Sequence, residues 1–233
     1  MPAHPPRSHR GPRRALNENE ILDAALALSD EGGSNAVSVR GIAARVGVAP
    51  NAVYTYFPDK AAVISALVER LLGDVNHQVF ADRTQPWRAR VESLALELKE
   101  RLAAHPGAVP LMFSGPMNGP QALGLSERLL ELLGDAGLRP TDAARATYLL
   151  IVYLFGSIAL TIPDPDQASP LPPEDVAARS RVSAKTPAQT YPRTTAAAPT
   201  RASYISTEQY LWGLHRLLDG ITPRGQAGET QLP

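Results

Sequence analysis

Residues 38–57 read SVRGIAARVGVAPNAVYTYF, and this stretch decides the fold of the chain. Ser38 can cap a short helix in which apolar residues recur at helical spacing, and Gly47 supplies a sharp bend after it. Pro50 suits the first position of a second short helix, because its missing N–H group is not needed there. The pattern predicts a helix-turn-helix, whose second helix can enter the major groove of DNA with its amino-terminal residues.

The residues on both sides of this stretch continue in helical rhythm. Asn17 with Glu20 three residues later resembles a capping pair, and Gly32-Gly33 is suited to end the helix that follows. Asp59 can cap a helix after the helix-turn-helix. Further helices are predicted at 86–104, 107–113, 119–135, 141–162 and 205–221. No alternating strand pattern bounded by hairpin turns occurs, so we expect an all-α fold.

Composition narrows the possible chemistry. The 233 residues include no cysteine, which excludes thiolate catalysis, disulfides and cysteine zinc sites. Lys and Arg number 23, as do Asp and Glu, so no bulk field draws the molecule to nucleic acid or to anionic lipid. Any such affinity must come from local placement of charge. Residues 1–60 hold seven basic and six acidic side chains, and most of these acids fall on the first predicted helix, which could face away from DNA.

Three stretches differ from the helical body. Residues 1–16 contain four arginines and no acid, which predicts a flexible basic arm, with a terminus of no function as the alternative. Residues 163–203 contain eight prolines and few large apolar side chains, which predicts a long mobile loop. Residues 146–162 form the one long uncharged stretch, which we interpret as a buried helix, since a single segment of this length is near the lower limit for a membrane span.

A domain division follows from these boundaries. We expect a flexible basic arm over 1–16 and a helix-turn-helix DNA-binding domain over 17–63. A ligand-binding and dimerisation domain over 64–223 carries the mobile loop, and a tail covers 224–233.

The residues of the helix-turn-helix carry a family resemblance. The stretch resembles the amino-terminal signature of the TetR family of bacterial transcriptional regulators over roughly residues 17 to 72. The matching positions are Arg40, Ile42-Ala43, Gly47-Val48, Tyr54-Thr55-Tyr56-Phe57 and Lys60. Ala49 departs from the pattern, because the family usually places there a serine that caps the recognition helix.

The resemblance implies DNA-contacting roles, and side-chain chemistry supports most of them. Arg40 can reach a guanine edge or a phosphate, and Asn51 offers amide donors and acceptors to a base. Tyrosine hydroxyls and a lysine can bind phosphate, although core packing is the alternative for a single tyrosine, and we expect Phe57 in the core. The predicted DNA-binding residues are Arg40, Pro50, Asn51, Ala52, Tyr54, Thr55, Tyr56 and Lys60.

The remainder of the chain resembles, more loosely, the ligand-binding domain of tetracycline-repressor-type members. This implies a homodimer whose last two long helices form a four-helix bundle across a two-fold axis. An apolar pocket is expected, and core packing is the alternative for each lining candidate. These candidates are Trp87, His105, Met112, Phe113, Met117, Leu129, Tyr148, Val152 and Phe155. Because Pro110-Leu111-Met112 offers no histidine where tetracycline-binding relatives hold a magnesium–drug complex, we expect no metal and no cofactor, and tetracycline is not inferred.

The leading hypothesis is a cytoplasmic, one-component transcriptional regulator, with repression as the commoner mode. It binds a palindromic DNA operator as a homodimer and is released by a small apolar ligand, with no membrane partner. The alternative is a helical enzyme that uses the interior pocket, but the sequence has no nucleophile elbow, no metalloprotease histidine pair and no phosphate-binding glycine loop. A DNA-binding dimer without an effector is the third interpretation.

Overall fold

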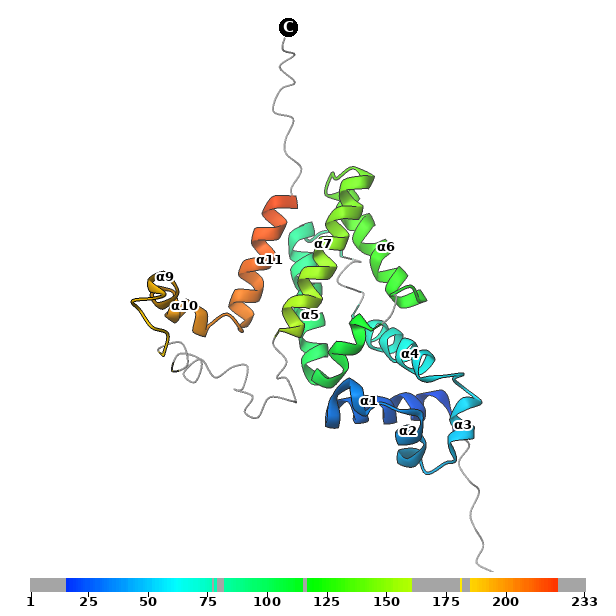
Figure 1. Cartoon of the computed structure of the whole chain (residues 1–233). Helices are drawn as coiled ribbons and strands as arrows, with labels where there is room; N and C mark the ends of the chain where they lie inside the picture. Colours follow the sequence, from blue (N-terminus) through cyan, green and yellow to red (C-terminus); the bar gives the residue numbers. More distant parts are fainter. Residues whose placement is uncertain are drawn as a thin grey trace, which may run out of the picture.

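The computed structural model describes residues 16–76, 78, 82–114, 117–160, 181 and 185–221 (Figure 1). Within these ranges the chain is helical and contains no strand, which confirms the predicted all-α class. The elements are α1 (Glu18–Ala36), α2 (Val39–Val46), α3 (Pro50–Tyr54), α4 (Lys60–Gly73), α5 (Trp87–Ala104), the 3₁₀ helix η2 (Pro106–Phe113), α6 (Pro120–Asp135), α7 (Pro140–Ala159), α9 (Pro192–Ala196), α10 (Ala198–Ala202) and α11 (Thr207–Ile221).

The first three helices form a small unit that we call the head. Asn17 caps α1 by accepting a hydrogen bond from the backbone N–H of Glu20 at 3.0 Å. Helical geometry is interrupted at Gly32 and Gly33, and Gly33 has a positive φ of 69°, so the predicted stop lies where the helix kinks. Ile21 and Ala25 on α1 are fully buried against the rest of the core.

The turn between α2 and α3 is shaped by the residues that begin and end these two helices. Ser38 caps α2 through a 3.0 Å hydrogen bond from the backbone N–H of Gly41. Gly47 ends α2 with φ 76°, a conformation in which other residues are strained. Ala49 gives α3 no side-chain cap, and Pro50 stands in its first turn. Val53 is fully buried and anchors α3 to the head.

The helices α5, α6, α7 and α11 pack side by side as the C-terminal bundle, and α4 joins this bundle to the head (Figure 1). Leucines dominate the interior of the bundle, because each helix places an apolar stripe at 3.6-residue spacing toward its neighbours. The fully or almost fully buried leucines are Leu94, Leu98, Leu129, Leu132, Leu133, Leu150, Leu154, Leu214 and Leu218.

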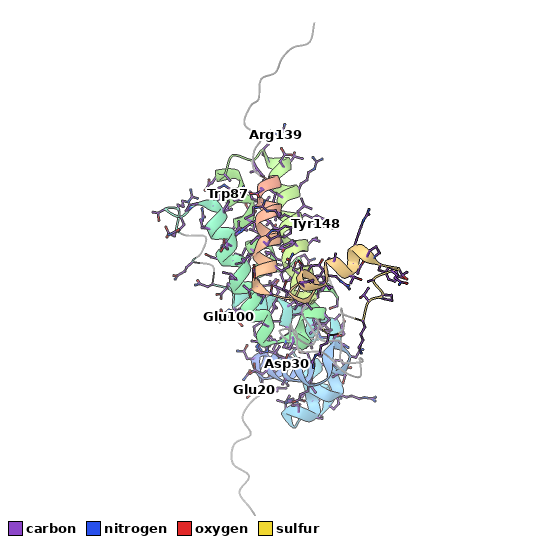
Figure 2. The ribbon with its side chains drawn as sticks, turned by 90° about the vertical axis from the view of Figure 1, so that its left-hand side faces the viewer. Glu20, Asp30, Trp87, Glu100, Arg139 and Tyr148 are labelled. Carbon is purple, nitrogen blue, oxygen red and sulfur yellow. The ribbon has the colours of Figure 1, made fainter. Side chains whose placement is uncertain are left out.

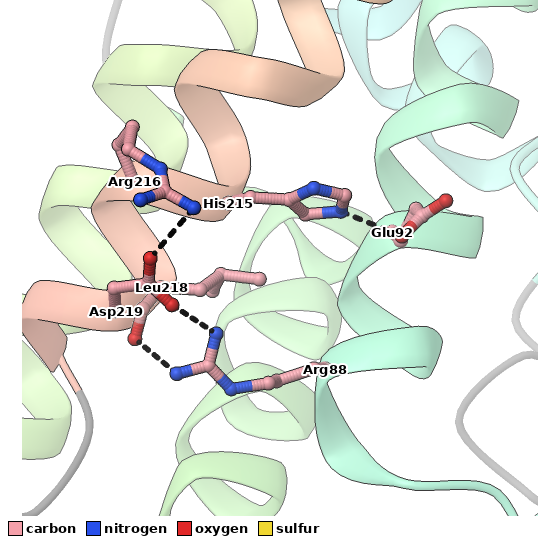
Figure 3. A network of polar contacts seen from close by, with 6 residues as sticks. All are labelled: Arg88, Glu92, His215, Arg216, Leu218 and Asp219. Carbon is pink, nitrogen blue, oxygen red and sulfur yellow. Dashed lines mark hydrogen bonds and ion pairs between the residues drawn. The ribbon is translucent and has the colours of Figure 1, made fainter.

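Polar contacts attach α11 to α5, and Figure 3 shows this network. Arg88 of α5 forms a 2.9 Å ion pair with Asp219 and donates a 3.0 Å hydrogen bond to the backbone carbonyl of Leu218. His215 contacts Glu92 at 2.8 Å one turn along. These contacts fix the rotation of α11 about its axis, so its apolar face stays on the bundle.

Helix α7 is, within the described ranges, long and apolar enough by composition to cross a membrane. It is part of the bundle core instead of an isolated span, because Leu150, Leu154 and Ile158 are buried among the neighbouring helices. This agrees with the interpretation of 146–162 as a core helix, although residues 161 and 162 lie outside the described ranges.

The region predicted as one long loop, 163–203, contains two short helices in its described part. Helices α9 and α10 start with Pro192 and Pro199 in their first turns. Proline is tolerated there because its missing N–H has no intrahelical partner, so proline content alone overstated the irregularity. The rest of the predicted loop, the basic arm to residue 15 and the tail after residue 221 lie outside the described residues.

Candidate functional site

Helix α3 presents its amino-terminal residues to solvent. Pro50 and Asn51 are exposed, Ala52 is partly exposed, and Tyr54 keeps half of its surface accessible. Val53 faces inward, so the buried residue holds the helix while the neighbouring residues remain available. This arrangement leaves the polar groups of Asn51 free to meet a base edge in a groove.

Two cations on adjoining helices complete this surface. Arg40 lies in the first turn of α2 and Lys60 is the first residue of α4, and both are exposed. Neither forms an ion pair with any residue of the described ranges. We call Arg40, Pro50, Asn51, Tyr54 and Lys60 the reading surface. Its cations are available for phosphate or base contacts, which are the contacts that position a protein on duplex DNA.

Two acids of α1 form ion pairs with arginines of neighbouring helices. Glu31 accepts two hydrogen bonds of 2.7 Å from the guanidinium of Arg45, and these bonds hold the pKa of the Glu31 carboxyl below its usual range. Asp23 pairs with Arg70 of α4 at 2.7 Å. The charges of Glu31 and Asp23 are therefore matched by arginines, which reduces the repulsion of phosphate by these two acids.

Two predicted phosphate donors already have partners. The Tyr56 hydroxyl donates to the backbone carbonyl of Leu16, and the Thr55 hydroxyl donates to the carbonyl of Asn51 at 3.3 Å. Either group must exchange this bond to donate to DNA. The Tyr56 contact also places Leu16, the last residue of the predicted basic arm, beside the end of α3.

A cavity of about 460 Å³ lies where α4 meets η2 and the segment after it. We call it the junction cavity. Its size falls in the range of small-molecule pockets. The described lining residues are Asp59, Ala61, Ala62, Ile64, Ser65, Val68, Glu69, Leu111, Met112, Ser114 and Met117.

The nine predicted ligand contacts do not gather in one place. Met112 and Met117 line the junction cavity. Leu129 and Phe155 are buried in the bundle core. The other five are exposed or partly buried.

Three of those five are surface residues: Phe113, Tyr148 and Val152 each expose half or more of their area. The ring of Phe113 makes an edge contact with Phe155, with centroids 6.5 Å apart. Tyr148 projects from the outside of α7 in Figure 2. The apolar periodicity of α7 identified these side chains but left open which of them face inward.

The remaining two are Trp87 and His105. Trp87 is half-buried, has the Arg88 guanidinium 5.1 Å from its ring centre, and lies at the end of the bundle away from Asp30 of α1 (Figure 2). His105 Nδ1 lies 2.9 Å from the Asp30 carboxylate, so this histidine joins the bundle to the head. Within the described ranges no three potential metal ligands gather, so no metal site can be assembled from them.

The 3₁₀ helix η2 packs directly on α1. A Cβ placed on Gly107 would lie 1.8 Å from the carbonyl oxygen of Ser29, so only glycine fits at this contact. With the His105–Asp30 pair, Gly107 makes η2 the element through which the bundle touches the first helix of the head. The contacts of η2 with α1 are thus made through the backbone of Ser29 and the side chain of Asp30.

Glu69 of α4 is a junction residue that the sequence did not reveal. Its carboxylate accepts hydrogen bonds from the backbone N–H groups of Gln121 at 2.7 Å and Ala122 at 3.2 Å, so α4 caps α6. A Cβ on Gly119 would lie 2.2 Å from the Glu69 carboxyl carbon. The uncapped Gly119-Pro120 start of α6 was the available signal, since such a start needs an acceptor from elsewhere.

Comparison with known proteins covers both parts of the chain. Residues 21–67 match the model of the bacterial regulatory proteins of the tetR family, and residues 81–224 match that of the tetracyclin repressor-like C-terminal domain. The HTH-type transcriptional repressor DrrR1 of Streptomyces coeruleorubidus is 27% identical over 160 residues, which are 65% of this chain and 56% of that protein. The chain thus spans under two thirds of the first curated relatives' length.

Solved structures agree on the fold. A chain described as a possible TetR family transcriptional regulator from Streptomyces coelicolor A3(2) superposes with a TM-score of 0.77 at 27% identity, covering 88% of this chain and 98% of that one. The Streptomyces coelicolor TetR family protein ActR, in complex with (S)-DNPA, gives a TM-score of 0.74 at 19% identity, covering 90% and 98%. At that identity the second likeness concerns the fold alone.

Proposed function

The chain belongs to the TetR family of bacterial regulatory proteins, and from this premise we propose that it is a ligand-released, sequence-specific DNA-binding transcriptional regulator. It binds a palindromic operator as a homodimer in the cytoplasm, acts as a repressor, and leaves the operator when a small apolar ligand stabilises a different spacing of its two heads. The enzyme alternative finds no support, because the matched relatives are named as transcriptional regulators or repressors.

The reading surface is the observation that carries this proposal. Asn51 and Arg40 are exposed, and no acid of the described residues pairs with Arg40, while Glu31 and Asp23 of α1 are held by arginines. Base-reading groups at the start of a short exposed helix, with cations beside them, are what readout in the major groove needs.

Operator selection from random duplexes with the full chain tests the proposal. We expect enrichment of a two-fold symmetric site, with half-sites about one helical turn apart, bound at least a thousandfold tighter than random duplex at moderate salt. Enrichment of no common sequence, or equal affinity for selected and random DNA, would refute it. Repeating the titration across salt concentrations separates phosphate contacts from base contacts.

An exposed apolar face supports the homodimer. Tyr148, Leu149 and Val152 on α7, together with Trp212 on α11, each expose about half of their surface or more. Monomeric soluble proteins rarely expose large contiguous apolar patches, and aromatic side chains are enriched at interfaces between subunits.

The oligomeric state gives a direct test of this face. We expect sedimentation equilibrium of the full chain to give twice the mass of one chain at micromolar concentration. Trp212→Arg should weaken the association at least tenfold, whereas Leu123→Arg, at an exposed leucine of α6, should leave it unchanged. A monomeric wild-type chain would contradict the homodimer and leave the DNA-reading assignment to its own test.

Ligand release follows from two-state linkage. A ligand lowers operator affinity only if it binds the non-operator conformation more tightly, and the operator then weakens ligand binding by the same factor. The ActR complex with (S)-DNPA is a case in which a protein of this fold holds a small organic molecule. The apolar lining of the junction cavity supports a ligand of that general kind for this chain.

A further inference from the structure

We propose, resting on the function above, that the junction cavity is the ligand site of this regulator and that it takes an apolar molecule that is uncharged or cationic instead of an anion. This specifies where the effector binds and which charge it can carry. Three features support it: the residues that line the cavity, the hydrogen bonds that hold its two carboxylates, and the contacts that its two walls, α4 and η2, make with the head.

The apolar part of the cavity suits a flat or irregular hydrocarbon. Ala62, Ile64 and Val68 of α4 form one wall, and Leu111 and Met112 of η2 form the other, with Met117 after it. Unbranched methionine side chains adapt to ligands of different outline. A volume of about 460 Å³ accommodates a molecule of two or three fused rings.

The charged groups among the described lining residues of the cavity are all negative. Asp59 and Glu69 contribute carboxylates and Ser65 and Ser114 contribute hydroxyls, while none of the described lining residues is Lys, Arg or His. Electrostatic forces are stronger in a partly dehydrated cavity than in water. An anion therefore meets two like charges there, whereas a cation gains from both.

The two carboxylates are anchored where they stand. Asp59 caps α4 by accepting a 2.8 Å hydrogen bond from the backbone N–H of Ala62. Glu69 caps α6 through the N–H groups of Gln121 and Ala122. Neither side chain can turn away from an anionic ligand without leaving a helix end uncapped, which costs stability.

The hydrogen-bonding groups favour donors on the ligand. Ser114 donates its hydroxyl proton to the carbonyl of Leu111 at 2.7 Å, so its oxygen is left to accept. Together with the carboxylates, this makes the anchored polar atoms of the cavity acceptors. A protonated amine or an alcohol matches them, and a carboxylate does not.

Both walls connect to the head, which gives the site a route to the reading surface. Helix α4 carries Lys60 at its start, and η2 rests on α1 through Gly107 and the His105–Asp30 pair. A ligand that separates α4 from η2 would shift the positions of both α1 and α4 relative to the bundle. Operator affinity then depends on occupancy of the cavity, as linkage requires.

A matched series of fluorescent probes tests the charge. We would titrate the full chain with 9-anthracenylmethylamine, 9-anthracenemethanol and 9-anthracenecarboxylate at neutral pH and follow fluorescence anisotropy. The amine and the alcohol should each bind at least about tenfold more tightly than the carboxylate. Asp59→Asn, which preserves the helix cap, should reduce the preference for amine over carboxylate about threefold or more. Asp74→Asn removes the same charge outside the lining and should leave that preference unchanged.

Thiol protection tests the place. Because the chain has no cysteine, Ser65→Cys introduces one thiol in the cavity wall, and exposed Ser93→Cys introduces one on α5 outside the lining. Saturating amine probe should slow alkylation by N-ethylmaleimide at least fivefold at the first position and not at the second. Far-UV circular dichroism establishes that both variants are folded, and the anisotropy series on the wild-type chain needs no variant.

Three results would overturn the proposal: tightest binding by the carboxylate, failure of both amine and alcohol to bind, or equal alkylation rates with and without probe at Ser65→Cys. Each is distinguishable from failure of the proposed function, because operator selection is measured on the ligand-free chain. If the chain selects an operator but gives any of these three results, the proposed DNA-binding function stands and the proposed ligand site is refuted.

Discussion

The head and the C-terminal bundle start their helices in different ways. In and directly after the head, three of the four helices begin with a side-chain cap of their own, at Asn17 for α1, Ser38 for α2 and Asp59 for α4, while α3 begins without one at Ala49. In the bundle, α5, α6 and α7 begin at residues that supply no side-chain cap, and α6 obtains one from Glu69 of α4. Only α11 among the bundle helices has its own cap, because the Ser206 hydroxyl accepts a 3.0 Å hydrogen bond from the backbone N–H of Gln209.

This difference bears on how the molecule responds to a ligand. A helix with its own cap keeps its start without help from its neighbours, so α1, α2 and α4 do not depend on the bundle for their first turns. A helix capped from another element depends on that element staying in place. The bundle is therefore the part in which a ligand can rearrange contacts, and η2 with Glu69 joins it to the head.

Removing the close contact between η2 and α1 should have the largest effect. Gly107→Ala puts a methyl group against the backbone of Ser29, and we expect a loss of about 2–3 kcal/mol in the free energy of unfolding. Urea unfolding followed by far-UV circular dichroism measures it. Gly124→Ala, in α6 with no atom within 4 Å of the added carbon, should instead stabilise by about 0.5–1 kcal/mol. Equal effects would mean that the two parts are not in contact in solution.

Substitutions on the reading surface should affect DNA binding while leaving the bundle intact. We expect Arg40→Ala and Asn51→Ala each to weaken binding to the selected operator by about 1–3 kcal/mol and to relax preference at one base position. Lys60→Ala should weaken all sequences alike and lower the salt slope by about one. Binding titrations on operator and random duplex distinguish these outcomes, and identical losses on both duplexes for all three variants would contradict the assignment.

Removing a helix cap in the head should cost more stability than changing an uninvolved serine in the bundle. Ser38→Ala deletes the acceptor for the N–H of Gly41, and the cost should be about 1 kcal/mol of unfolding free energy. Ser93→Ala, at an exposed position inside α5, is the control and should be neutral or slightly stabilising because alanine is the better helix former. A cost at Ser93 as large as that at Ser38 would show that the cap is not the cause.

The smallest expected effect concerns pH. Arg45 holds the pKa of Glu31 below its ordinary value, so the pair contributes stability above the unfolded pKa and loses it as the pH falls through the folded value. The stability difference between the wild type and Glu31→Gln should thus be complete near neutral pH, begin to fall near the unfolded pKa of about 4.3, and vanish only below the lowered folded pKa. Thermal unfolding at several pH values measures this. A difference that grows toward acid pH would reverse the assigned sign.

The sequence predicted the fold best where its signals were local. The caps at Asn17, Ser38 and Asp59 and the bend at Gly47 each involve residues at most four apart, so no knowledge of the tertiary structure was needed. The family relationship, stated from residues 40–60, was also confirmed. The exposure of Arg40, Asn51 and Lys60 agrees with their predicted DNA-contacting roles, which stay a prediction.

The candidate ligand residues could not be predicted as well, for a physical reason. Helix α7 is apolar nearly all round, so the spacing of Tyr148, Val152 and Phe155 does not determine which side faces the core. Glu69 and Gly107 act through partners 52 and about 78 residues away in the chain, and no local pattern marks such contacts. Capping from another helix and close backbone approach are visible only after the helices are packed.

The polar contacts between α5 and α11 bear on the order in which the head and the bundle fold during synthesis. Arg88 contacts Leu218, which lies 130 residues later in the chain. Contacts within the head join residues that are closer in sequence, such as Leu16 and Tyr56, which are 40 residues apart. Contacts distant in sequence form late, and chains acquire structure from the amino terminus as they leave the ribosome. A nascent chain is therefore expected to have a folded head while its bundle still lacks α11, and the proposed pairing with a second copy would follow once α11 has packed.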